Sequence, residues 1–134
     1  CSSCLLWENC RYDWWNKINE QILELKLKDK LIAVCPEQLW WLSTPRKPSE
    51  LVWEKILTKD WENYTDQFDK WAKEVLDIIK RYNITEAILK QWSPSCGSGK
   101  IYDWTFTWKQ INWDWVTTKL LKENWIKVIS EEEL

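Results

Sequence analysis

The chain has no histidine, no methionine and only two glycines among its 134 residues. The absence of histidine excludes His-based catalytic triads, histidine general bases and histidine metal ligands. A metal site in this chain must therefore use cysteine and carboxylate ligands.

Long apolar runs and a surplus of basic residues are also missing. No segment approaches the roughly 18 apolar residues of a membrane helix, so we expect no membrane span. The net charge is −2, with acidic and basic residues interspersed. The basic stripe that marks nucleic-acid-binding proteins is absent, so we expect no nucleic-acid partner. The oligomeric state does not follow from composition.

The chain contains unusually few glycines and unusually many tryptophans. An average chain carries about 7% glycine, whereas this one has 14 Trp and 2 Gly. Six tryptophans follow Asp or Asn, as glycine does in the strongest turn signals: Trp14, Trp61, Trp104, Trp113, Trp115 and Trp125. Trp125 also stands where a helix-ending glycine is expected.

Tryptophan does not adopt a positive φ without strain. We infer that most of these tryptophans stand where the natural protein has glycine, for instance through a reassigned stop codon that the cell reads as glycine. The alternative is a genuine Trp-rich surface that binds a ligand.

The five cysteines are odd in number and show no small-scaffold disulfide pattern. This favours a reducing cytoplasm, where thiols bind metal or catalyse. The chain opens on Cys1 without a methionine, and we expect that it is trimmed inside its first strand.

Apolar segments alternate between strand-like and helix-like patterns. Residues 1–134 are enough for one domain with a single core. Strands are predicted at residues 1–6, 31–34, 84–90 and 126–130. Residues 51–58 are predicted as a further strand or irregular arm, and residues 101–115 as a small hairpin or ordered loop. Helices are predicted at residues 16–28, 65–82 and 116–124. This order predicts an α/β fold, a three-layer sandwich with a mainly parallel, Rossmann-like sheet.

Cys4, Cys35 and Cys96 each lie at the end of a predicted strand. Ligand sites of open α/β sheets lie outside the carboxyl ends of the strands, and thiolates favour zinc, copper(I) or iron–sulfur clusters. A structural zinc site prefers four ligands with close Cys-x₂-Cys pairs. Three scattered cysteines suit a [4Fe–4S] cluster with one iron free of protein ligands. A zinc-binding module and simple burial of the cysteines remain alternatives. Cys10 is read as a free thiol.

Five polar residues accompany these cysteines. Glu37 follows Cys35 by two residues and is a candidate general acid or base, or an ordinary surface carboxylate. Ser93 and Ser95 flank Pro94 before Cys96 and either orient a substrate or belong to a turn. Asp13 and Arg46 are loop charges that either bind substrate or form salt bridges.

Three blocks of the chain, in order, resemble the thiouracil desulfidase family, long catalogued as a domain of unknown function. Cys4-Leu-Leu-Trp-Glu-Asn-Cys-Arg-Tyr-Asp-Trp resembles Cys-Leu-Leu-Gly-x-x-x-Arg-Tyr-Asp-Gly. Cys35-Pro-Glu-Gln-Leu-Trp-Trp-Leu-Ser-Thr-Pro-Arg resembles Cys-Pro-Glu-x-x-Gly-Gly-Leu-x-x-Pro-Arg, and a third block begins at Ser93. The family has glycine at six Trp positions: Trp7, Trp14, Trp40, Trp41, Trp104 and Trp108.

The resemblance implies a [4Fe–4S] cluster held by Cys4, Cys35 and Cys96, with Glu37 and Ser93 as catalytic residues. Substrate contacts are expected from Ser95, Arg46 and Asp13. The implied reaction removes sulfur from a thiolated pyrimidine base such as 2-thiouracil and releases sulfide. Relatives commonly carry apolar residues at position 10, so Cys10 is not counted as a ligand. A non-catalytic iron–sulfur or sulfide-carrier protein is the alternative function. Indoles at positions 7, 40 and 41 are expected to crowd the cluster loops.

Overall fold

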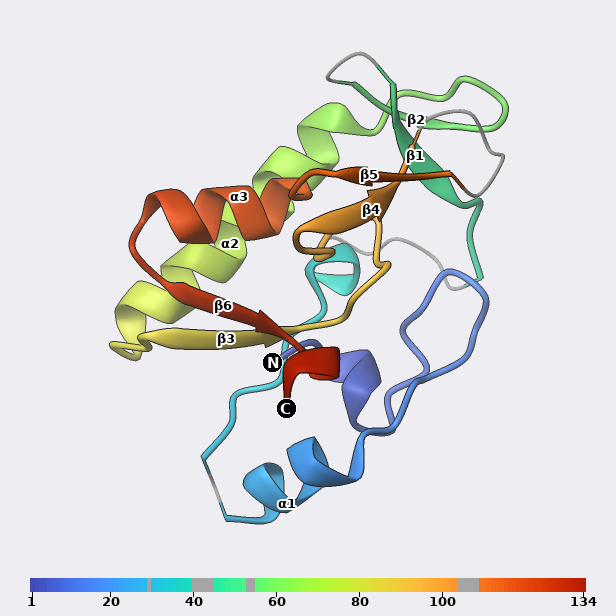
Figure 1. The fold of residues 1–134 in the computed structure, drawn as a ribbon. Coiled ribbons are helices and arrows are strands. Elements are labelled where there is room, and N and C mark those ends of the chain that lie inside the picture. The colour runs from blue at the N-terminus through green and yellow to red at the C-terminus, as the bar shows by residue number, and fades with distance from the viewer. Residues whose placement is uncertain (29, 40–44, 53–54, 104–108) are drawn as a thin grey trace.

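The fold is mixed α/β and is seen in a computed structural model that describes residues 1–28, 30–39, 45–52, 55–103 and 109–134. The helices are α1 (Glu20–Leu27), α2 (Thr65–Arg81) and α3 (Val116–Glu123). The strands are β1 (Ser49–Val52), β2 (Lys55–Thr58), β3 (Glu86–Leu89), β4 (Lys100–Tyr102), β5 (Gln110–Asn112) and β6 (Lys127–Ser130). Figure 1 shows the β3–β6 pair near both chain ends, and the other strands at the opposite end.

The predicted mainly parallel sheet is present only in part. Within the described residues, β3 and β6 form the one parallel pair of strands, and β1–β2 and β4–β5 are antiparallel pairs. Of the strand predicted at residues 31–34, only an isolated parallel bridge between Ser2 and Val34 is present. The three-layer sandwich is not evident from these small sheets.

Backbone hydrogen bonds nevertheless bring four extended segments side by side. Ser2 donates its N–H to the carbonyl of Ile88 at 3.0 Å, and Ser3 donates to Val34 at 2.9 Å. The chain start therefore lies between β3 and residues 31–34, which places Cys4 and Cys35 beside the end of β3.

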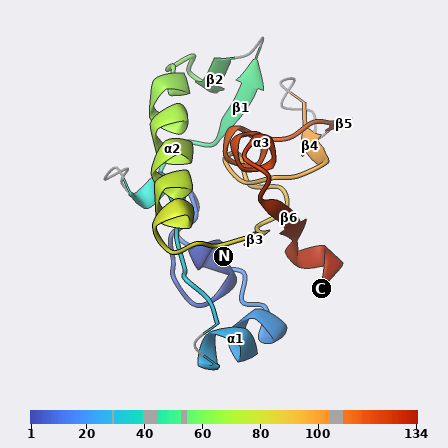
Figure 2. The same ribbon diagram turned by 90° about the vertical axis from the view of Figure 1, so that its left-hand side faces the viewer.

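Helices α2 and α3 pack against each other on one side of β3 and β6, and α1 lies at the far end (Figures 1 and 2). The apolar positions of α2 recur every three or four residues, and its buried face packs on β3 and α3. The core there is formed by Val75, Leu76, Ile79, Ala87, Leu89, Cys96 and Leu121. Cys96 is thus part of the core and not a mobile surface thiol.

Element boundaries differ from the predictions for local reasons. Helix α1 begins at Glu20 because Asn19 caps it, its side chain accepting the N–H of Ile22 at 3.1 Å. Helix α2 ends at Arg81, so Tyr82 lies outside the buried face and is 60% exposed. In place of one strand or arm at 51–58, β1 and β2 form an antiparallel pair. The antiparallel pair β4–β5 corresponds to the hairpin predicted at 101–115.

Positive φ angles coincide with tryptophan. Among the described residues, five non-glycine residues have positive φ, and four of them are Trp14, Trp61, Trp92 and Trp125, with φ between 62° and 64°. The left-handed region is costly for any side chain except glycine, and less so for asparagine. The backbone therefore agrees with the inference that glycine belongs at these positions. No helix of the described residues is long and apolar enough to cross a bilayer.

Candidate metal centre

Cysteines from three distant parts of the chain line one cavity of about 480 Å³, a size typical of small-molecule sites. The predicted ligands Cys4, Cys35 and Cys96 all line it, as does Cys10. Glu37, Ser93 and Ser95 contribute to the same wall. The cavity lies at the carboxyl end of β3, as the strand-end argument predicts.

Local structure presents each of these thiols. Cys4 lies in a 3₁₀ turn, Ser3–Leu5. Cys35 precedes a second 3₁₀ turn, Pro36–Gln38, in which Pro36 occupies the first helical position. The backbone of Cys96 is held by α3, where the buried hydroxyl of Thr118 donates to the Cys96 carbonyl at 2.5 Å.

The residue after Cys96, Gly97, has little room for a side chain. A Cβ at Gly97 would lie 3.0 Å from the carbonyl oxygen of Ser93 and 3.0 Å from the ring of Trp115. A side chain at this position would push against these neighbours, and glycine lets the loop pack tightly against α3.

The thiols differ in how readily they ionise. Burial raises the pKa of Cys96 to about 12. Hydrogen bonds to Cys35 and Cys4 raise the pKa of Cys10 well above its ordinary value. The hydrogen bond from Cys10 lowers the pKa of Cys4, against the effect of burial. Cys10 is therefore the donor in its hydrogen bond with Cys4.

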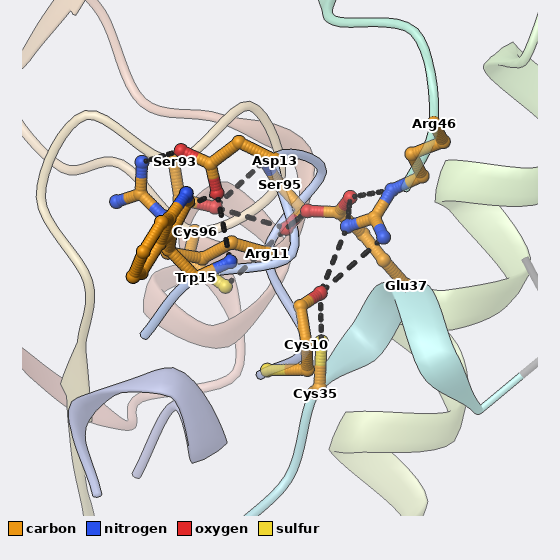
Figure 3. A network of polar contacts seen from close by, with 10 residues as sticks. All are labelled: Cys10, Arg11, Asp13, Trp15, Cys35, Glu37, Arg46, Ser93, Ser95 and Cys96. Carbon is orange, nitrogen blue, oxygen red and sulfur yellow. Dashed lines mark hydrogen bonds and ion pairs between the residues drawn. The ribbon is translucent and has the colours of Figure 1, made fainter. Parts of the chain in front are cut away.

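Glu37 is buried, 7% exposed, and both of its oxygens have partners (Figure 3). Ser95 donates its hydroxyl to Oε1 at 3.0 Å, and Arg46 donates its Nε–H to Oε2 at 2.7 Å. The Ser95 hydroxyl also lies 3.2 Å from that of Ser93 and 3.5 Å from Sγ of Cys96. A carboxylate is thus connected to the pair of hydroxyls at the cavity wall.

Asp13 and Arg46, the two charged residues predicted to bind substrate, are each paired with an oppositely charged side chain. Asp13 forms a two-pronged pair with Arg11, at 3.0 and 2.7 Å, which lowers the pKa of the Asp13 carboxyl. Arg11 lines the cysteine cavity, whereas Arg46 lines an adjacent cavity of about 50 Å³. The side chain of Arg46 points to Glu37 and to the carbonyl of Cys10.

Cys10 lies closer to the candidate ligands than the sequence indicated. It is 1% exposed, hydrogen-bonded to Cys4 and Cys35, and its carbonyl lies 4.0 Å from Sγ of Cys35. The signal available in the sequence was its position six residues after Cys4 in the first cysteine block.

The chemistry of the cavity wall suits a cluster of irons bound by thiolates. Over the ranges that the structure describes, no group of three Cys, Asp or Glu side chains is arranged to hold a single metal ion. A [4Fe–4S] cluster makes a different demand, because each thiolate binds a separate iron and the sulfurs lie farther apart than around one ion.

The tryptophans near the site fall into three groups. Trp7 is 59% exposed and is not among the residues that line the cavity, so the expected crowding at position 7 is not found. Trp92 and Trp115 do line the cavity. Trp40, Trp41, Trp104 and Trp108 lie outside the described residues.

Comparison with known proteins gives one consistent result. Residues 1–133 match the 2-thiouracil desulfurase family. The chain is 40% identical over 143 aligned positions to the uncharacterized protein YbbK of Bacillus subtilis (strain 168), covering 99% of this chain and 95% of that protein. It is also similar to the solved structure of the [4Fe–4S]-dependent thiouracil desulfidase TudS (DUF523Vcz). The TM-score is 0.94 and the identity 36%, with coverage of 99% of this chain and 89% of that one.

Proposed function

The chain belongs to the 2-thiouracil desulfurase family, and from this premise we propose that it is a [4Fe–4S]-dependent desulfidase of thiolated pyrimidine bases. The net reaction exchanges the C=S group of a base such as 2-thiouracil for C=O, consuming water and releasing hydrogen sulfide. The observation that carries the proposal is the meeting of Cys4, Cys35 and Cys96 at one cavity.

Cys4, Cys35 and Cys96 would hold the cluster. When bound, a cluster with one iron free of protein ligands supplies a Lewis acid for the thiocarbonyl sulfur. Burial of Cys96 opposes its ionisation, but a metal ion deprotonates a coordinating thiol outright.

Glu37 is the proposed general base. Its Oε1 faces the serine pair and accepts a proton from the attacking water, while Ser95 and Arg46 hold the carboxylate in place. Ser93, connected to Glu37 through the Ser95 hydroxyl, orients the polar edge of the base. Ser95 and Asp13 are proposed as further substrate contacts.

Anaerobic reconstitution with iron and sulfide tests this function. We expect visible cluster absorption and sulfide release from 2-thiouracil by the wild-type chain. Cys35→Ser should abolish both, because it removes a proposed ligand. Cys10→Ser is the matched control and should retain the cluster, since Cys10 is not one of the three proposed ligands.

The other outcomes contradict the proposal in specific ways. Cluster absorption without sulfide release would favour a non-catalytic iron–sulfur or sulfide-carrier protein. Stoichiometric zinc without iron absorption would favour a structural zinc module. Turnover that survives Cys35→Ser would overturn the ligand assignment.

Four further predictions, on domain, fold, location and partner, accompany this function. We propose that residues 1–134 form one domain, for which a single cooperative unfolding transition is the test. We propose that the extended segments form one sheet of a Rossmann-like three-layer sandwich, for which slow amide exchange at Ser3 and Val34 is the test. We also propose a cytoplasmic location, which cell fractionation tests. The proposed partner is a free thiolated base and not a nucleic acid, which binding assays test.

A further inference from the structure

Arg46 has its charged end buried beside the candidate site. Its side chain is 10% exposed and that of Glu37 is 9% exposed. Both its Nε–H and a terminal N–H donate to the same oxygen, Oε2 of Glu37, which leaves Oε1 for Ser95. The carboxylate is therefore fixed in one orientation by partners on both sides (Figure 3).

The same guanidinium also contacts the first cysteine segment. Its two terminal nitrogens donate to the carbonyl of Cys10 at 3.3 and 3.2 Å, and the backbone N–H of Arg46 donates to Tyr12 at 2.9 Å. That Cys10 carbonyl is the one that faces Sγ of Cys35.

These contacts join all three cysteine-bearing segments. Arg46 binds the Cys4–Cys10 segment through the Cys10 carbonyl and the Cys35 segment through Glu37. Glu37 in turn binds the Cys96 segment through Ser95. A planar guanidinium can serve several acceptors in fixed directions, which a lysine ammonium cannot do.

We propose that Arg46 is a positioning residue, which holds Glu37 and the three cysteine segments in their working arrangement and does not bind substrate. The kinetic part of this inference rests on the proposed function. Residues of this kind contact the surroundings of the metal ligands and not the metal itself. Their mutation typically lowers metal affinity or activity by about 10- to 100-fold.

The variants Arg46→Gln and Arg46→Lys test the proposal in the reconstituted chain. Arg46→Gln should lower kcat about 10- to 100-fold and leave KM nearly unchanged. Arg46→Lys, which keeps the charge without the planar fork, should fall between Arg46→Gln and wild type. The double variant Glu37→Gln/Arg46→Gln should be no slower than Glu37→Gln, because residues that act as a unit are not additive.

Lys47→Gln is the matched control. Lys47 is the next residue, is half exposed, and pairs with Asp60 at 2.8 Å and Glu62 at 3.3 Å on the surface. Its removal also deletes a cation of this segment but should leave kcat, KM and cluster retention at wild-type values.

Two readouts do not depend on turnover. Iron should pass to a chelator about tenfold faster from Arg46→Gln than from wild type. In the cluster-free protein, a thiol reagent should label the buried Cys10 and Cys96 faster in Arg46→Gln, because their segments are no longer joined. If circular dichroism shows that Arg46→Gln does not fold, Glu37→Gln is used in its place. This variant breaks the same connection from the other side and should speed both iron transfer and thiol labelling.

A raised KM with kcat retained would make Arg46 a substrate ligand and overturn the proposal. Equal iron loss and equal thiol labelling in wild type and Arg46→Gln would also overturn it. A wild-type chain that binds the cluster but releases no sulfide would contradict the proposed function alone, and the two turnover-independent readouts would still decide the role of Arg46.

Discussion

Asn83 and Trp125 occupy the same position relative to the helix that precedes each of them. Each follows the C-cap of its helix with a positive φ, 51° for Asn83 and 63° for Trp125. Ile84 donates to Ile79 and Ile126 donates to Leu121, the six-to-one hydrogen bond of a Schellman motif. Asparagine tolerates this conformation, whereas an indole that is 95% exposed gains nothing from it.

Trp125→Gly should therefore raise the free energy of unfolding by about 1 kcal/mol, because it relieves the left-handed backbone strain. Asn83→Gly is the control and should change it by only a few tenths of a kcal/mol, since asparagine already accepts this φ. Urea denaturation measures both changes. Equal effects of the two substitutions would contradict the interpretation that glycine belongs at position 125.

Helix α3 packs in the core and also positions the loop that carries the proposed cluster ligand Cys96. The hydroxyl of Thr118, fully buried, donates to the carbonyl of Cys96, which is itself in the core with Leu121. A buried carbonyl without a partner is costly. The helix therefore holds the third cysteine loop through one side-chain hydrogen bond.

Thr118→Val should lower the free energy of unfolding by about 1–3 kcal/mol, because the Cys96 carbonyl loses its donor in a buried environment. Thr118→Ser keeps the hydroxyl and should cost clearly less. The comparison is made by urea denaturation of the cluster-free protein. Valine keeps the methyl group of threonine and lacks only the hydroxyl, so a valine variant that costs no more than the serine variant would contradict the role of this hydrogen bond.

At the scale of the whole molecule, the candidate site joins elements that local hydrogen bonding connects only weakly. The described sheets have two strands each, and residues 31–34 pair with the chain start through an isolated bridge. A cluster bound by Cys4, Cys35 and Cys96 would join the chain start, this segment and the loop after β3. Ligands that bind only the folded state stabilise it by mass action.

Removal of the cluster should therefore lower Tm by about 10 °C, which corresponds to roughly 3 kcal/mol for a chain of this size. Thermal melts under anaerobic conditions, before and after chelation of iron, measure the change. Cys35→Ser should show the same Tm with and without reconstitution. An unchanged Tm of the wild-type chain on chelation would contradict the joining role of the cluster.

The sequence by itself determined the family, the three cysteine blocks and helix α2, because each depends on residue types at short spacing. It also indicated where glycine is missing, since positive φ is a local demand of turns and helix ends. Strand lengths were overestimated because short apolar runs specify burial but not how many ladder hydrogen bonds form.

Only the tertiary structure decided what the charged and thiol side chains face. Arg46 meets the Cys10 carbonyl from 36 residues away, and Glu37 meets Ser95 from 58 residues away. No local pattern specifies such pairings, because they result from how α2, α3 and the extended segments pack. The physical reason is that a loop charge chooses its partner only when folding has buried it and made an unpaired charge costly.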